Sequence, residues 1–118
     1  MTQCEYQAYL SKHPKRYDKP EPATTPEKDL HTWILKECAQ RGWVVFHGSM
    51  AHATHRTAGE PDFIILACEG RTILVEVKTR TGKLSSEQIG MAQRASKLGH
   101  TIHLVRTVRE FLDVANNM

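Results

Sequence analysis

Residues 59–78 read GEPDFIILACEGRTILVEVK, and this stretch decides the fold. It contains two apolar runs, 62–67 and 72–78, separated by the turn-forming pair Glu69-Gly70. Two short runs of this kind with a glycine turn between them predict an antiparallel β-hairpin. Because both runs are apolar almost throughout, we expect both faces of the sheet that contains them to be covered by helices.

The predicted hairpin should bring polar side chains close together at one of its ends. Asp62 opens the first strand and Glu76 lies near the end of the second, with thirteen residues between them. The returning strand therefore brings Glu76 alongside Asp62. Two neighbouring carboxylates repel each other unless a cation lies between them, and a hard divalent cation such as Mg²⁺ takes oxygen ligands and keeps several waters.

Lys78 adds a positive charge at the same end of the hairpin. It follows Glu76 by two residues, so both side chains project from the same face of the strand. A lysine there can orient or deprotonate an attacking water, or offset charge on a phosphate. The structural alternative is that Glu76 and Lys78 form an ion pair and Asp62 caps its strand. The conjunction of Pro-Asp, two apolar strands and Glu-x-Lys favours a metal site.

A helix is predicted upstream of the hairpin. Thr25 is expected as its N-cap, and Pro26 suits the first helical position because its missing N–H costs nothing there. The helix should end at Arg41, since Gly42 can adopt the left-handed conformation that terminates helices. Its buried stripe is formed by residues that repeat every four positions: Leu30, Ile34 and Cys38.

Glu27 lies three residues before Leu30, which places it on that same stripe. A carboxylate on the inward face of a helix start indicates a role in a site. The alternative is a first-turn acid that is favoured by the helix dipole.

The rest of the chain completes an α-β-β-β-α-β-α order. Strands are predicted over 43–47 and 101–105, a long loop over 48–59, and a closing helix over 108–114. Ser85 begins another helix, with Gln88 either as its capping-box partner or as a site residue, and Gly99 ends it. The buried side of this helix is expected to contain Ile89, Ala92 and Leu98. The fold class is α/β, with a central sheet flanked by helices.

Composition indicates one globular domain. The chain has 118 residues, 40% of them hydrophobic and 25% charged. No apolar run approaches the roughly 20 residues that span a membrane, and 1–10 lack the layout of a signal peptide, so we expect a cytoplasmic protein. Cys4, Cys38 and Cys68 show no C-x-x-C spacing, which argues against a disulfide framework or a zinc knuckle. We expect Cys38 and Cys68 to be buried thiols.

The net charge of +3 permits a nucleic-acid partner without establishing one. Candidate phosphate contacts are Arg56 in the long loop and Arg80 and Lys83 directly after the Glu-x-Lys strand; the alternative is a solvated basic loop. A zinc site is disfavoured because the histidines of the long loop region are irregularly spaced and lack a cysteine. These histidines are His47, His52 and His55.

Residues 1–24 differ from the domain that we place at 25–118. Pro14, Pro20 and Pro22 interrupt any helix, and 12–19 are rich in basic residues. This arm is predicted either to contact DNA or a partner subunit, or to be a loosely held tail.

The chain resembles the PD-(D/E)XK nuclease superfamily and, within it, the VRR-NUC family. The matching motifs, spread in order over 25–115, are Glu27 in the first helix, Gly59-Glu60-Pro61-Asp62, Glu76-Val77-Lys78 and Leu84-Ser85-Ser86-Glu87-Gln88. The resemblance implies a restriction-endonuclease-like core of order α-β-β-β-α-β around a mixed sheet.

The resemblance also implies roles for single residues. Asp62, Glu76 and the backbone carbonyl of Val77 would bind Mg²⁺ or Mn²⁺, and Lys78 would be catalytic. The further members of the active site would be Glu27, as a metal-site carboxylate acting directly or through water, and Gln88, as an accessory residue.

These features predict a divalent-metal-dependent DNA endonuclease that hydrolyses phosphodiester bonds with a metal-activated water. A small domain has little surface for reading bases, so we expect selectivity for branched DNA such as four-way (Holliday) junctions. Small one-domain members of the family resemble phage proteins that act as dimers, which implies a homodimer. The alternatives are a nicking or flap-type repair nuclease, a catalytically silent DNA-binding module, or a subunit of a larger replication or packaging complex.

Overall fold

The computed structural model describes residues 5, 8–9, 12–17, 25–47 and 57–117. Their order of helices and strands is the predicted α-β-β-β-α-β-α. The elements are α2 (Glu27–Arg41), β1 (Val44–His47), β2 (Phe63–Leu66), the short 3₁₀ helix η2 (Cys68–Gly70), β3 (Thr72–Val77), α3 (Ser86–Lys97), β4 (Ile102–Val105) and α4 (Val108–Asn116).

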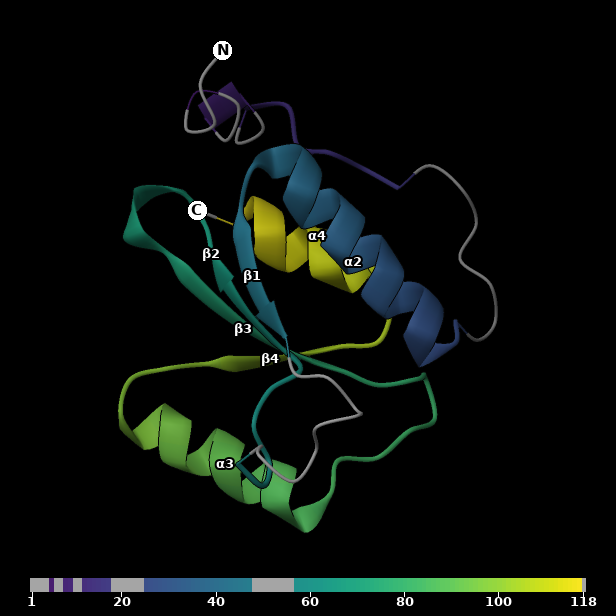
Figure 1. The fold of residues 1–118 in the computed structure, drawn as a ribbon, viewed down its shortest axis with the longest axis vertical. Coiled ribbons are helices and arrows are strands. Elements are labelled where there is room, and N and C mark those ends of the chain that lie inside the picture. Colours follow the sequence, from purple (N-terminus) through teal and green to yellow (C-terminus); the bar gives the residue numbers. More distant parts are fainter. Residues whose placement is uncertain (1–4, 6–7, 10–11, 18–24, 48–56, 118) are drawn as a thin grey trace.

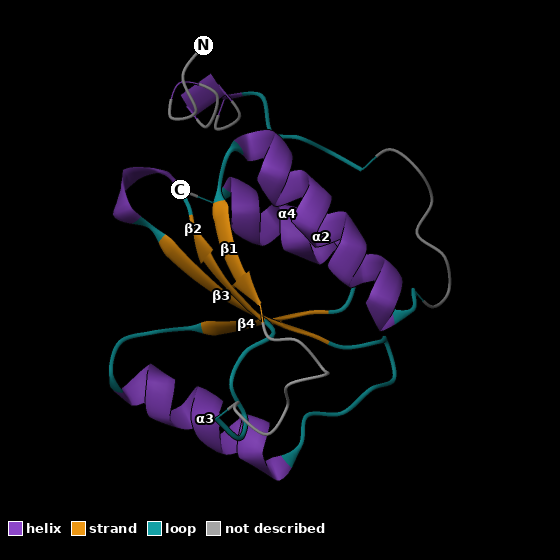
Figure 2. Ribbon diagram, viewed as in Figure 1, coloured by secondary structure: helices purple, strands orange, loops and turns teal. Residues whose placement is uncertain are grey.

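The four strands form one mixed sheet in the order β1-β2-β3-β4 (Figure 2). β1 and β2 are antiparallel, as are β2 and β3, whereas β3 and β4 are parallel. Helices α2 and α4 lie together on one face of the sheet, and α3 lies on the other side (Figure 1). The predicted α/β fold with a central mixed sheet flanked by helices is therefore confirmed.

The predicted hairpin is formed by β2 and β3. Phe63 pairs with Val75 at its open end and Leu66 pairs with Thr72 next to the turn. Continuing this register by one residue brings Asp62 opposite Glu76. The turn is η2, in which Glu69 has a left-handed φ of 63°.

The core lies between the sheet and the helix pair α2–α4. It contains Phe63 and Ile65 of β2 together with Val75 and Val77 of β3. The opposite face of β1 and β2 is not buried, so the prediction that both faces are covered is wrong for these two strands. The exposed fractions are 52% for Val44, 56% for Phe46, 39% for Ile64 and 42% for Leu66. Among the described elements, the helix on this side is the short α3, which packs beside β4 at the other end of the sheet.

Helix α2 differs from its prediction at its start. It ends as expected at Gly42, which has φ 75° and whose amide donates to the helix carbonyls. Its N-cap is Pro26 rather than Thr25, and no side chain caps it. The Pro26 carbonyl accepts from the amides of Asp29 and Leu30, so the first turn is closed by backbone alone. The stripe of Leu30, Ile34 and Cys38 is fully buried, as predicted.

Helix α3 begins as predicted but buries less than predicted. Ser85 Oγ accepts from the Gln88 amide over 3.2 Å, and Gln88 Oε1 accepts from the Ser85 amide over 2.8 Å, which completes the capping box. The predicted buried side is wrong: Ile89 is 45% and Leu98 77% exposed, and Ala92 is half-buried. The reason is that α3 approaches the sheet mainly at β4, so little of its surface is covered.

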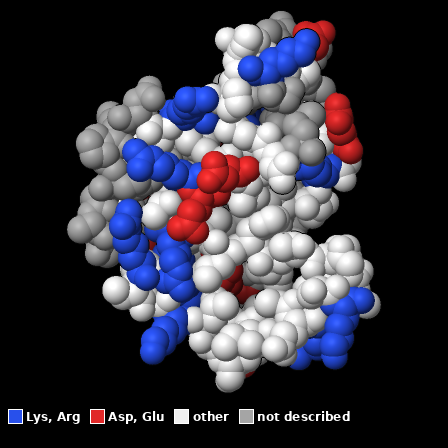
Figure 3. Space-filling view, turned by 180° about the vertical axis from the view of Figure 1, so that it is seen from behind, with Lys and Arg blue, Asp and Glu red and all other residues white. Residues whose placement is uncertain are grey.

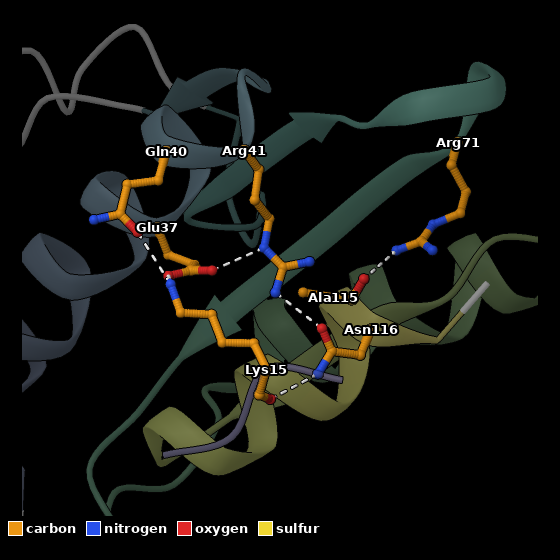
Figure 4. A network of polar contacts seen from close by, with 7 residues as sticks. All are labelled: Lys15, Glu37, Gln40, Arg41, Arg71, Ala115 and Asn116. Atoms are coloured by element: carbon orange, nitrogen blue, oxygen red, sulfur yellow. Dashed lines mark hydrogen bonds and ion pairs between the residues drawn. The ribbon is translucent and has the colours of Figure 1, made fainter. Parts of the chain in front are cut away.

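The segment 15–17 of the N-terminal arm packs against α2 and α4 (Figure 4). Lys15 Nζ donates to Glu37 Oε1 over 2.7 Å, and the Lys15 carbonyl accepts from Asn116 Nδ2 over 3.0 Å. The Tyr17 ring meets the Trp33 ring edge-on, with 6.3 Å between centroids. This part of the arm is thus tied to the domain, whereas a domain boundary at 24/25 stays a prediction.

Cys38 and Cys68 differ in how far they are buried. Cys38 is buried as predicted, and burial raises the pKa of its thiol to about 12. Cys68 is only half-buried, because it lies in the hairpin turn rather than in the core, so that prediction is wrong. Cys4 lies outside the described residues. None of the described helices is long and apolar enough to span a membrane.

Candidate active site

A cavity of about 560 Å³ lies where the start of α2, the segment before β2, the end of β3 and the start of α3 meet. It brings together all five side chains that the sequence proposes as catalytic. The lining residues are Glu27, Thr57, Ala58, Gly59, Glu60, Asp62, Glu76, Lys78, Ser85, Glu87 and Gln88.

Asp62 is held against the end of β3. Its Oδ2 accepts a hydrogen bond from the Val77 amide over 2.8 Å. The hairpin register makes this contact possible, because Asp62 precedes β2 directly and faces the last residues of β3. The same oxygen lies 3.8 Å from Nε2 of His31, which is half-buried on α2 and was not among the predicted site residues.

Glu76 is nearly buried, with 5% of its surface exposed. Its Oε1 accepts a hydrogen bond from Gln88 Nε2 over 2.9 Å. Its neighbours Val75 and Val77 face the core on the other side of β3, as the alternation of a strand requires. Glu76 therefore points to the cavity because the core takes the residues on either side of it.

Lys78 continues β3 past its last residue. Its amide donates to the Val105 carbonyl over 3.1 Å, which extends the pairing with β4 and fixes the backbone of Lys78 at the cavity. Among the described residues that line the cavity it is the one cationic side chain, facing five carboxylates: Glu27, Glu60, Asp62, Glu76 and Glu87. This excess of negative charge is suited to a bound cation.

The donor set fits a hard divalent ion held partly by water. Among the described residues no group of three or more His, Cys, Asp and Glu side chains is close enough to hold a metal ion. Asp62, directly before β2, and Glu76 of β3 are, however, two carboxylates at the open end of the hairpin. Mg²⁺ is commonly bound by one or two carboxylates plus waters and substrate phosphates. Coordination by the Val77 carbonyl stays a prediction.

Glu27 does not have the inward-facing position that was predicted for it. Its side chain is exposed rather than inward on the buried stripe, because the first turn of α2 extends past the core. It nevertheless lines the cavity. Glu27 therefore stands at the wall of the site, and among the described residues it is not part of a group of three side chains that could hold a metal ion.

Sequence reasoning assigned no role to Glu60 and Glu87, although both lie in the quoted motifs. Glu60 Oε2 accepts from the Thr57 amide over 3.1 Å. A hydrogen bond from its own backbone amide, followed by one from Ser86, lowers the pKa of Glu87. The sequence does indicate a position for His31 near the site: it lies four residues after Glu27, which places both side chains on one face of a helix.

Gly59 lets the segment before β2 close onto α3. Its φ is +81°, and a Cβ on this residue would lie 2.3 Å from the backbone oxygen of Glu87. Any side chain here would force the two walls of the cavity apart. The glycine of the Gly59-Glu60-Pro61-Asp62 motif is thus explained by a close approach of backbone to backbone.

The predicted DNA contacts Arg80 and Lys83 are exposed and follow Lys78 along the chain. Seen from behind, Lys and Arg side chains gather along one side of the molecule (Figure 3). Arg56 lies outside the described residues. Contact of any of these residues with DNA stays a prediction.

A second cavity, of about 830 Å³, lies away from this site, between β3, β4 and α4. It is lined by residues that include Arg71, His103 and Asp113. Burial, and then the charge of Arg71, lowers the pKa of His103. Without paired carboxylates beside a lysine, this larger cavity lacks the chemistry of the first.

Comparison of the sequence with protein-family models and with curated proteins finds no match. Comparison of structures finds a solved chain described as a VRR_NUC domain, with a TM-score of 0.61 at 22% sequence identity. The similarity covers 75% of this chain and 90% of that one. The chain thus has the fold of a VRR_NUC domain, and the resemblance seen in its motifs is confirmed at the level of the fold.

Proposed function

We propose that this protein is a Mg²⁺- or Mn²⁺-dependent DNA endonuclease that hydrolyses phosphodiester bonds, with branched DNA such as four-way junctions as its substrate. The observation that carries the proposal is the cavity that gathers Asp62, Glu76 and Lys78 beside Gln88 and Glu27. Glu27, Asp62, Glu76 and Gln88 come from separate parts of the chain. The backbone of Lys78 is fixed by the hydrogen bond of its amide to the Val105 carbonyl. The VRR_NUC fold is consistent with this assignment.

Asp62 and Glu76 would hold the metal, which when bound supplies Lewis-acid stabilisation of phosphate charge and an activated water. The protein's own part is to keep both carboxylates in place. The Val77 amide holds Asp62, and the Gln88 side chain holds Glu76. Lys78 is the residue we assign to orient the attacking water or to offset charge on the phosphate.

Selectivity for branched DNA and a homodimer are parts of the same proposal. A twofold dimer would present two equivalent sites to two strands. Support for a partner surface comes from the exposed apolar side chains on the outer face of β1 and β2, since contiguous apolar patches on proteins mark interaction sites. Light scattering of the wild-type protein and Phe46→Glu should show a dimer and a monomer, respectively.

The deciding experiment is cleavage of an end-labelled four-way junction and a matched linear duplex, with Mg²⁺ or Mn²⁺. Lys78→Ala tests the site, and Lys97→Ala is the matched control, because Lys97 is an exposed lysine in the last turn of α3. Paired symmetric cuts in the junction alone are expected. They should fall by about 10²- to 10⁴-fold in Lys78→Ala and be unchanged in Lys97→Ala.

The other outcomes separate the alternatives. Cutting of both substrates would keep the nuclease and remove the junction preference. A single cut near a nick or flap would favour a repair nuclease. DNA binding without cutting, by wild-type protein in either metal, would contradict the nuclease and indicate a silent binding module.

A further inference from the structure

The segment between Lys78 and α3 contains a compact turn. The Gly82 amide donates to both the carbonyl and the hydroxyl oxygen of Thr79, over 3.2 and 3.0 Å. The turn is tight, since a Cβ on Gly82 would lie 3.0 Å from Thr79 Oγ1 and 3.6 Å from the Lys78 Cβ. The conformation of 79–82 is therefore coupled to the position of Lys78.

Arg106, the residue after β4, holds this turn. Its Nη1 donates to three backbone carbonyls of the turn: that of Thr79 over 2.5 Å, that of Arg80 over 3.2 Å and that of Gly82 over 2.6 Å. Arg106 follows β4 directly, at the point where Val105 accepts from the Lys78 amide. One guanidinium thus fixes a turn whose residues lie 24 to 27 positions earlier in the chain.

Several positively charged residues lie on or next to this turn, and their charges do not stabilise it. Arg80 is exposed on it, the exposed Lys83 follows it and Lys78 precedes it, so holding it with a further arginine gathers four cations in a short region. Like charges at close range disfavour the arrangement. The carbonyls offset the charge of Arg106, and Lys78 faces the carboxylates of the cavity. Arg80 and Lys83 are left exposed to solvent for an anionic partner such as a phosphate backbone.

We propose that Arg106 is a positioning residue for DNA: by clamping the carbonyls of 79–82 it presents Arg80 and Lys83 to the phosphates beside the cavity. It does so through the turn and not by contacting DNA itself. The inference rests on the proposed function, because it takes nucleic acid as the ligand.

The experiment is a cycle of variants in which affinity for a four-way junction is measured in Ca²⁺, an ion chosen to avoid cleavage. The variants are Arg106→Ala, Arg80→Ala with Lys83→Ala, and all three together. We expect Arg106→Ala to weaken binding by about tenfold and to lower the slope of log affinity against log salt by about 1–2, the value for one or two lost phosphate contacts. Added to the Arg80/Lys83 pair, it should have little further effect.

Three controls distinguish positioning from loss of charge or of fold. Arg94→Ala removes an arginine from α3, about 12 Å along the helix from its start, and should leave affinity unchanged. Thr79→Val loosens the turn without changing charge, and should weaken binding in the same direction as Arg106→Ala. Arg106→Lys should rescue in part, since an ammonium donates to carbonyls without the planar fork. Hydrogen exchange at the Gly82 amide should accelerate in Arg106→Ala and in Thr79→Val.

Full additivity of Arg106→Ala with the Arg80/Lys83 pair would overturn the inference, because it would mean that Arg106 acts independently of them. An unchanged salt slope in a folded Arg106→Ala protein would do the same. Failure of the proposed function looks different: wild-type protein binds the junction but does not cut it in Mg²⁺ or Mn²⁺, while the binding cycle can still be read.

Discussion

Gln88 joins the cap of α3 to the nearly buried carboxylate of Glu76. Its Oε1 accepts from the Ser85 amide over 2.8 Å, while its Nε2 donates to Glu76 Oε1 over 2.9 Å. The sequence offered these contacts as alternatives, a capping-box partner or a residue of the site. In the structure one side chain makes both, so the start of α3 cannot shift without moving the partner of Glu76.

Replacing Gln88 should separate the two contacts. Gln88→Ala loses both hydrogen bonds and should lower the free energy of unfolding by about 1–3 kcal/mol. Gln88→Glu keeps an acceptor for the Ser85 amide but places a second carboxylate against Glu76. We expect the capping hydrogen bond to persist while the two carboxylates repel each other, so that cleavage activity is lost at neutral pH, measured by junction cleavage. Equal activity of Gln88→Glu and wild type from pH 6 to 9 would contradict a role for this contact.

Asp62 should have a structural and a chemical role that different substitutions resolve. An asparagine oxygen can still accept from the Val77 amide, whereas alanine leaves that partly buried amide unpaired. We expect the free energy of unfolding of Asp62→Ala to be about 1–3 kcal/mol lower than that of Asp62→Asn. Both variants should lose cleavage, because both lose the carboxylate. If the two unfold alike, the hydrogen bond to Val77 does not contribute to stability.

The sequence predicted the parts of this fold that depend on local pattern. The hairpin followed from two apolar runs and a turn, and its length was enough to bring Asp62 beside Glu76. The capping box followed from Ser85 and Gln88, three residues apart. In each case the interacting groups are neighbours in sequence or are related by one turn, so their geometry is set by few torsions.

What the sequence did not predict depends on packing between distant elements. Ile89 and Leu98 have the spacing of a buried helix face but are exposed, because coverage of α3 is decided by where the sheet ends. The clamp of Arg106 on the turn joins residues far apart in the chain. Likewise, Glu60 and Glu87 meet at the cavity through the close approach of Gly59 to α3. No periodicity encodes such contacts.

The buried ion pair of Glu37 and Arg41 should be costly to break from one side. Arg41 Nε donates to Glu37 Oε2 over 2.8 Å, and Arg41 Nη2 donates to Asn116 Oδ1 over 2.9 Å (Figure 4). Only 1% of Arg41 and 4% of Glu37 are exposed. Arg41→Met leaves Glu37 in the interior with the more exposed Lys15 as its counterion, so we expect a loss of about 3–5 kcal/mol in unfolding free energy.

Two comparisons test that explanation by urea denaturation. Lys15→Met removes the more exposed partner of Glu37 and should cost at most about 1 kcal/mol. Glu37→Leu combined with Arg41→Met removes both buried charges and should recover most of the stability lost in Arg41→Met. A double variant as unstable as Arg41→Met would mean that packing of the arginine stem on Trp43, whose ring centroid lies 5.0 Å from the guanidinium, dominates instead.

Metal dependence should follow Asp62 and Glu76, the two carboxylates at the open end of the hairpin, rather than the whole acidic wall of the cavity. Chelation with EDTA should abolish cleavage, and Mg²⁺ or Mn²⁺ should restore it. In calorimetric titration with Mn²⁺, Asp62→Asn and Glu76→Gln should each abolish binding. Glu27→Gln should weaken it less, because the Glu27 side chain is exposed at the wall of the cavity, whereas Asp62 is held by the Val77 amide and Glu76 is nearly buried. Absence of binding by wild-type protein at millimolar Mn²⁺, both with and without DNA, would exclude a metal site here. Equal losses in all three variants would instead mean that Glu27 moves in to become a direct ligand when the ion binds.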